Sequence, residues 1–293
     1  IVKLANNGIR ARKHKIRAAF LAITVCISIM AIGLGIGNRN IKYNSFRTIF
    51  TYVTEGGEFE FQKYDDTGVV ITSAESFSED GVVEFPSYVT LNDSGLFKKN
   101  VVAIGENVFN ENATKVTNII IPKCVKYIGK DAFSGCSSLT EVTFEKNSQL
   151  EIIASHAFAL CSSLANINIP AAVTIFGEGA FSDCRELSDI MFAENSKLTN
   201  IENNAFAYCS NLKNIVIPKN VINIGKNAFL NCSSLSIITI PKGVANIGSN
   251  VFSGCNVTIH CEVESRPGGW AEDWNGGNTV IWSNSETVEL KGL

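Results

Sequence analysis

Cysteine is the residue type in this sequence with the widest chemistry, since thiols form disulfides, bind metals and act as nucleophiles. The chain holds nine cysteines, and six of them recur at one position of a repeated pattern: Cys136, Cys161, Cys184, Cys209, Cys232 and Cys255. A shared position predicts an inward-facing column in which each thiol acts as a small hydrophobic group rather than as half of a disulfide. Cys124 and Cys261 lie outside this column and are the one candidate pair for a disulfide, although they are far apart in the sequence.

Metal binding is the second chemistry to consider, at Cys255, His260 and Cys261. Thiolate and imidazole are good zinc ligands, but zinc normally takes four such groups, and Cys255 is already accounted for by the repeat. The sequence therefore predicts no metal site, and nothing in it points to a cofactor.

Catalysis would need a nucleophile with a general base beside it, and no such pair stands out. His156 lies where other repeats carry aspartate, glycine or asparagine, which indicates an exposed position that is free to vary. Glu141 and Asp189 could form a carboxylate pair, but their register is filled elsewhere by asparagine and isoleucine. That variation favours a solvated face over general acid catalysis, so the sequence predicts no catalytic residue and no enzyme.

These side chains must be positioned by the repeat that dominates the chain. Phenylalanine recurs at intervals of 23 to 25 residues: Phe109, Phe133, Phe158, Phe181, Phe206, Phe229 and Phe252. The column cysteines follow these phenylalanines from Phe133 onward, and leucine comes after the cysteine in five repeats: Leu139, Leu164, Leu187, Leu212 and Leu235. Apolar and polar residues then alternate, which indicates a short strand with one buried face: Val142/Phe144, Ile167/Ile169, Ile190/Phe192, Ile215/Ile217 and Ile238/Ile240.

A repeat of about 24 residues cannot bury its own phenylalanine, leucine and cysteine, so successive repeats must stack as the coils of a solenoid. Proline closes the strand in four repeats because it cannot donate to a sheet: Pro122, Pro170, Pro218 and Pro241. Two repeats instead run into turn-rich loops, at residues 144–148 and 192–196, which gives a longer period of 48 residues. The expected fold is mostly β and irregular, with short parallel strands stacked in coils and with caps at both ends.

The strand residues that alternate with the buried ones must point out of the sheet. They are Glu141, Thr143, Asn166, Asn168, Asp189, Met191, Asn214, Val216, Ile237 and Thr239. Solenoids commonly bind partners on such a face, so these ten positions are the predicted partner-binding surface.

The first forty residues differ sharply from the rest. Residues 1–17 are rich in lysine and arginine, and residues 18–37 are apolar and uncharged. Twenty helical residues rise roughly 30 Å, enough to cross a hydrocarbon layer, and basic residues before them predict a cytoplasmic N-terminus. We therefore expect a membrane-anchored protein with most of its chain outside the cytoplasm. We favour a retained anchor, with a cleaved signal segment as the alternative.

The unit C-x-x-L-x-x-I-x-I-P-x-x-V-x-x-I-G-x-x-A-F resembles the BspA-type, or Treponema-type, leucine-rich repeat of surface proteins. The resemblance covers residues 101–263 and implies a leucine-rich-repeat solenoid, and residues 57–100 are similar to the looser first coil of that family. The chain is accordingly expected to contain a basic cytoplasmic segment (1–17), a transmembrane anchor or signal segment (18–37), a linker (38–56), a divergent N-terminal cap (57–100), the repeats (101–263) and a C-terminal cap and tail (264–293).

All three tryptophans, Trp270, Trp274 and Trp282, follow the last repeat. Exposed indoles can stack on sugars, so a glycan-binding module is one hypothesis for this segment. The interpretation that we favour is that the indoles cap the open end of the solenoid. The segment also resembles the closing stretch of many bacterial proteins with these repeats, which supports a cap.

The charge balance argues against nucleic acid as a partner, because 25 lysines and arginines face 28 acidic residues and leave no broad basic face. The repeat family is similar to bacterial adhesins, which implies a cell-surface interaction or adhesion module that binds an extracellular protein or matrix partner. An alternative starts from residues 10–17 and the apolar segment, which resemble the first transmembrane helix of FtsX/MacB-type ABC permeases. On that hypothesis the solenoid is the extracellular domain of a transporter fragment.

Overall fold

A computed structural model describes residues 49–54, 57–64, 68–90 and 98–283 of the chain. Within these ranges the regular structure is almost entirely β, with one 3-10 helix, η1 (Asn110–Lys115), and no α-helix. The part of the chain that is described contains no helix with the length and hydropathy of a membrane span. The predicted segments 1–17 and 18–37, and with them the resemblance to ABC permeases, lie outside the described residues.

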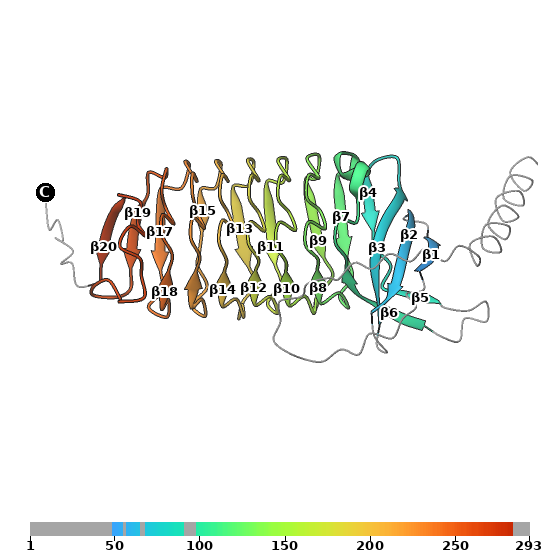
Figure 1. Cartoon of the computed structure of the whole chain (residues 1–293), viewed down its shortest axis with the longest axis horizontal. Helices are drawn as coiled ribbons and strands as arrows, with labels where there is room; N and C mark the ends of the chain where they lie inside the picture. Colours follow the sequence, from blue (N-terminus) through green and yellow to red (C-terminus); the bar gives the residue numbers. More distant parts are fainter. Residues whose placement is uncertain (1–48, 55–56, 65–67, 91–97, 284–293) are drawn as a thin grey trace, which may run out of the picture. The chain divides into compact units, whose positions relative to one another are not determined.

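One long sheet runs along the first side of the stacked coils, which Figure 1 shows as a row running from green through yellow to red. Its strands pair in the order β1 (Ile49–Thr54), β2 (Gly57–Lys63), β3 (Gly68–Phe77), β6 (Lys98–Ile104), β8 (Tyr127–Ile128), β10 (Ile152–Ile153), β12 (Ile175–Phe176), β14 (Asn200–Ile201), β16 (Asn223–Ile224) and β18 (Asn246–Ile247), with β5 (Tyr88–Thr90) on β6. From β3 to β18 every pair along this path is parallel, as expected when each coil contributes one strand to each side.

Three shorter sheets follow one another along the second side. They contain β4 (Val82–Glu84), β7 (Asn118–Ile121) and β9 (Glu141–Phe144); β11 (Asn166–Ile169), β13 (Asp189–Phe192) and β15 (Asn214–Ile215); and β17 (Ile237–Ile240), β19 (Thr258–Cys261) and β20 (Thr279–Trp282). All of these pairs are parallel. The inward strand residues are buried, or half-buried at Phe144 and Phe192, as the alternating pattern predicted. The predicted leucine-rich-repeat solenoid is therefore confirmed for the repeats.

The inside of the solenoid is an aromatic column. The repeat phenylalanines are buried, and their ring centroids follow one another at steps of 5.0 to 5.8 Å from Phe109 to Phe252. Backbone hydrogen bonds also join each coil to the next. The Phe158 N–H donates to the Ala180 carbonyl and the Phe181 N–H donates to the Ala205 carbonyl, both at 2.8 Å. One repeated sequence position thus supplies both packing and hydrogen bonding between coils.

The cysteines of the repeat form a second inner column. All eight cysteines of the described residues are free thiols, and those of the column are fully buried except Cys255, which is partly exposed at the last coil. From Cys161 onward, each column thiol lies 3.1 to 3.3 Å from the carbonyl oxygen of the phenylalanine in the preceding coil and donates to it. Cys124 and Cys261 do not pair, because they belong to coils near opposite ends of the row.

One turn position has a backbone conformation that the sequence analysis missed. His156, predicted to be free to vary, has φ of +55°, and the equivalent residues have φ between +53° and +59°: Asn107, Asp131, Gly179, Asn204, Asn227 and Asn250. The prediction is wrong, because left-handed backbone restricts this position to glycine and to residues such as asparagine, aspartate and histidine.

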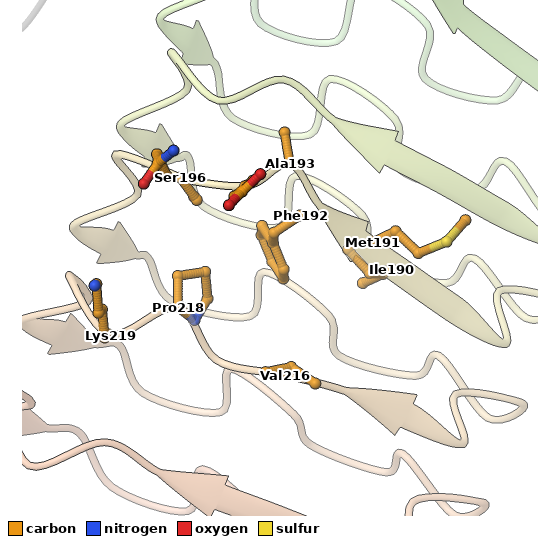
Figure 2. Close-up of a pocket in the computed structure, with 10 residues that line it drawn as sticks. Ile190, Met191, Phe192, Ala193, Ser196, Val216, Pro218 and Lys219 are labelled. Atoms are coloured by element: carbon orange, nitrogen blue, oxygen red, sulfur yellow. The ribbon is translucent and has the colours of Figure 1, made fainter.

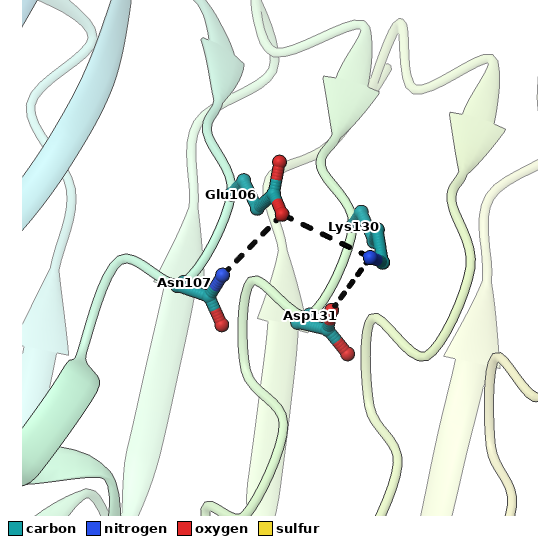
Figure 3. A network of polar contacts seen from close by, with 4 residues as sticks. All are labelled: Glu106, Asn107, Lys130 and Asp131. Atoms are coloured by element: carbon teal, nitrogen blue, oxygen red, sulfur yellow. Dashed lines mark hydrogen bonds and ion pairs between the residues drawn. The ribbon is translucent and has the colours of Figure 1, made fainter. Parts of the chain in front are cut away.

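Asn107 and Asp131 also belong to an exposed network with Glu106 and Lys130, in which the Lys130 ammonium lies 4.0 Å from Glu106 and 3.6 Å from Asp131 (Figure 3). Exposed ion pairs of this kind add little stability.

The N-terminal end is closed by the antiparallel first strands of the long sheet. β1 pairs with β2 over its whole length, and β2 pairs with β3, which begins the parallel series. The linker predicted over residues 38–56 is therefore wrong for residues 49–54, whose β-branched and aromatic side chains favour a strand. Residues 38–48 lie outside the described residues. Phe59 and Phe85 extend the aromatic column at this end, since their ring centroids are 5.5 Å apart and Phe85 lies 6.1 Å from Phe109.

The C-terminal end is closed by indoles. Trp274 packs edge-on against Phe252, the last ring of the column, and Trp270 packs edge-on against Trp274. Both are 2% exposed, and the Trp270 indole N–H donates to the Val244 carbonyl at 3.0 Å. The Asn278 amide donates to the Phe252 carbonyl at 2.7 Å, the group that a column thiol would reach if another coil followed. The segment thus covers both the rings and the open carbonyl of the last coil.

Alkaline pH should test the thiol column. Burial raises the pKa of the Cys136 thiol to about 12, well above its ordinary value of about 8.5. A raised pKa in the folded state means that stability is complete below the ordinary pKa and is lost as pH rises toward the folded value. We expect the free energy of unfolding to fall between about pH 9 and pH 12, by on the order of 3 kcal/mol from this one group. Urea denaturation at several pH values measures it, and Cys136→Ala should show a correspondingly shallower fall.

The left-handed turn position gives a prediction at Asn227, whose φ is +57°. Asn227→Val should lower the free energy of unfolding by about 1–2 kcal/mol, because a β-branched residue is strained in this conformation. Asn227→Gly should stay within about 0.5 kcal/mol of the original protein, since glycine adopts positive φ without strain. Equal denaturation midpoints for the valine and glycine variants would show that backbone strain does not govern this position.

Candidate functional site

The ten residues of the predicted partner-binding surface lie together on the second side of the solenoid, on the strands β9, β11, β13 and β17 and at β15. The parallel pairing of β11, β13 and β15 brings Asn166, Asp189 and Asn214 side by side. Nine of the ten are exposed and Asp189 is half-buried. The alternation read from the sequence thus places these side chains on one continuous outer face, which we call the strand face.

Three residues of the strand face are apolar. Met191 is 50% exposed, Val216 is 80% exposed and Ile237 is 52% exposed, although neighbouring coils carry threonine or asparagine at the equivalent positions. The three lie on successive coils at β13, β15 and β17. Their exposure leaves apolar surface in contact with water on three consecutive coils.

The rest of the strand face is polar and includes two carboxylates. The Glu141 carboxylate accepts hydrogen bonds from Asn118, at 2.9 Å, and from the Thr143 hydroxyl, at 3.1 Å. Asp189 accepts from the Ser188 hydroxyl at 2.8 Å and from the Asn214 amide at 3.4 Å. These bonds hold each carboxylate against the sheet while leaving it on the solvent side of the strands.

The structure adds a feature that the sequence analysis missed, a hollow at the edge of the strand face. Figure 2 shows the Phe192 ring turned toward Pro218 of the following coil, with Ala193 and Ser196 on one side and Met191 and Val216 on the other. This hollow, the Phe192 hollow, has a volume of about 530 Å³. Its outer wall is the loop 193–196, which is one of the two turn-rich loops recognised in the sequence.

An equivalent hollow of about 520 Å³ lies two coils earlier. In this Phe144 hollow the loop 145–148 forms the outer wall, Pro170 takes the place of Pro218, and Thr143 and Asn168 take the places of Met191 and Val216. Met191, Phe192 and Ala193 line both hollows, so the two adjoin at β13. The longer repeats were the sequence signal for these hollows, because in them a turn-rich loop takes the place of the proline that closes the strand.

The other chemical candidates are placed as follows. Trp270 and Trp274 are buried against the last coil, so they present no open ring for sugar stacking, and Trp282 is half-buried beside them. His156 sits in its turn, half-buried. Within the described ranges, no group of three or more His, Cys, Asp and Glu side chains could hold a metal ion.

Solved structures of bacterial repeat proteins resemble this fold. A leucine-rich repeat protein of T. pallidum is 26% identical over 67% of this chain and 86% of its own, with a TM-score of 0.55. A leucine-rich repeat protein from Bacteroides ovatus is 22% identical over 83% of this chain and 71% of its own, with a TM-score of 0.49. A leucine rich cell surface protein from Faecalibacterium prausnitzii is 19% identical over 81% of this chain and 96% of its own, with a TM-score of 0.42.

No curated protein sequence matches the chain. The family described as BspA type Leucine rich repeat region matches in six copies, over residues 102–198 and 146–259. These matches cover residues 102–259 together, which is more than half of the 293 residues. They contain the phenylalanine and cysteine columns, the strand face and both hollows. The chain therefore belongs to the BspA-type leucine-rich-repeat family.

Proposed function

We propose that this protein is a surface interaction module that binds an extracellular protein or matrix partner through the strand face. Leucine-rich-repeat solenoids are typically binding modules without catalytic activity, and membership of this family supports a binding role. The proposal includes an extracytoplasmic location, which the basic and then apolar sequence of residues 1–37 supports.

The observation that carries the proposal is the group of exposed apolar side chains on three successive coils, Met191, Val216 and Ile237. Each belongs to a position that the fold leaves free, since the neighbouring coils fill it with asparagine, threonine or glutamate. A solenoid that only had to stay soluble would gain nothing from apolar residues there. Apolar side chains surrounded by polar ones are typical of a protein interaction surface.

The polar part of the strand face suits the same role. Glu141, Asn166, Asp189 and Asn214 offer hydrogen-bonding groups on the same face as the apolar residues. An apolar centre contributes most of the binding free energy, and a polar surround selects the partner. Binding through fixed strands also requires little ordering of the protein, because the sheet holds these side chains in place before the partner arrives.

Binding assays on the full chain against a panel of immobilised matrix and serum proteins test this proposal. Met191→Arg and Ile237→Arg should each weaken binding of a captured partner about tenfold or more, because a charge replaces an apolar contact on the face. The control is Ile222→Arg, since Ile222 is also exposed, at 46%, but lies beside β16 on the first side of the solenoid. Unchanged binding by the two face variants, or an equal loss in the control, would contradict the assignment of the partner to the strand face.

A further inference from the structure

The two hollows are copies of one arrangement. Phe144 and Phe192 form their floors, and Pro170 and Pro218 form their inner walls. Asn147 and Asn195 turn the outer loops with φ of +62° and +61°. A ligand that fits one hollow through a given group could therefore place a second group in the other, provided that its own repeat matches the spacing.

That spacing follows from the stacking of the coils. The ring centroids of the coils that carry the hollows are separated by steps of 5.0 Å, from Phe133 to Phe158, and 5.3 Å, from Phe158 to Phe181. The hollows therefore repeat at about 10 Å along the solenoid, close to twice the spacing of neighbouring strands.

A peptide in the polyproline II conformation has the same repeat. It has three residues per turn and a rise of about 3.1 Å, so side chains at i and i+3 point the same way about 9.3 Å apart. An extended strand brings side chains to one face about every 6.7 Å and does not match. An α-helix would set a further side chain between the two hollows, where Met191 stands at their shared rim.

The two hollows differ in charge and polarity. The Phe192 hollow is lined by Met191 and Val216 beside its phenylalanine and proline, and the two charged residues in its lining, Glu194 and Lys219, have opposite signs. The Phe144 hollow is lined by Glu141 and Glu145, with Thr143 and Asn168, and contains no lysine or arginine. An apolar residue therefore complements the first hollow, and a cationic residue complements the second.

We propose that the strand face binds a proline-rich segment of its partner in the polyproline II conformation, with proline in the Phe192 hollow and arginine or lysine, three residues away, in the Phe144 hollow, whose lining includes Glu141 and Glu145. The inference rests on the proposed function and names the partner's chemistry. The preformed conformation of such a segment lowers the entropy lost on binding, and the aromatic floor packs against the proline ring.

A peptide of seven residues, Pro-Pro-Pro-Arg-Pro-Pro-Pro, with acetylated and amidated ends, is the probe. It has proline three residues from arginine in both directions, so it fits whichever way it lies. Fluorescence anisotropy with the full chain should give saturable binding. Replacing arginine by glutamate, or both terminal prolines by glycine, should weaken binding about tenfold, because each change empties one hollow of its matching group.

Variants of the protein locate the site. Val216→Asn, which copies the residue at position 168, and the pair Glu141→Gln with Glu145→Gln should each weaken peptide binding about fivefold to tenfold. The glutamate pair should also reduce the dependence of binding on salt. Ile222→Asn and Glu151→Gln are matched controls on exposed residues next to β16 and β10 and should bind as the original protein does.

The outcomes separate this inference from the proposed function. Equal binding of the arginine and glutamate peptides, or no peptide binding, would overturn the polyproline assignment. If Met191→Arg still abolished binding of a captured partner in that case, the interaction role of the strand face would stand and only the class of ligand would fall. Peptide binding lost on Val216→Asn and retained by both controls supports the assignment.

Discussion

Every buried side chain in the repeats depends on contact between successive coils. A single coil has one phenylalanine, one cysteine and a few aliphatic residues on its inner side, too few to exclude water alone. Stacking completes the core, since each ring lies between two others and each column thiol donates to a carbonyl of the coil before it. Because the same contacts recur, each further coil adds to the stability of the solenoid. The two end coils have a neighbouring coil on one side only, so other residues must cover them.

This constraint also determines which residues are free for function. The inner positions and the left-handed turns are fixed by packing and backbone conformation, whereas the outward positions of the strands are held in place but unconstrained in type. Met191 and Val216 occupy such positions, and so do Glu141 and Asn168. The solenoid thus separates residues that maintain the fold from residues that can adapt to a partner, and it presents the second group at regular intervals on rigid strands.

Much of the fold could be predicted from the sequence because identical side chains at a fixed period have identical surroundings. Phe158 and Cys184 could be placed in the core, and Glu141 and Asn166 on the outer face, without coordinates. The turn at His156 was predicted wrongly because the variation in residue type suggested that any residue is accepted there. Aspartate, asparagine, glycine and histidine have in common that they tolerate positive φ. β1 was missed because its pairing with β2 lies outside the repeat, and the hollows depend on contacts between the loop of one coil and the proline of the next.

The 48-residue double repeat has a consequence for how such a protein can grow. A tandem duplication of this length would add two coils, one of each loop type, and would leave every existing ring, thiol and turn in register. It would also create one more hollow, about 10 Å further along the same edge. The tryptophan and Asn278 closure would remain compatible with the new final coil, because its contacts with the Phe252 ring, the Phe252 carbonyl and the Val244 carbonyl would recur there unchanged. The number of double repeats in the gene would then determine the length of the ligand that the surface can bind, with no change to the chemistry of any single coil.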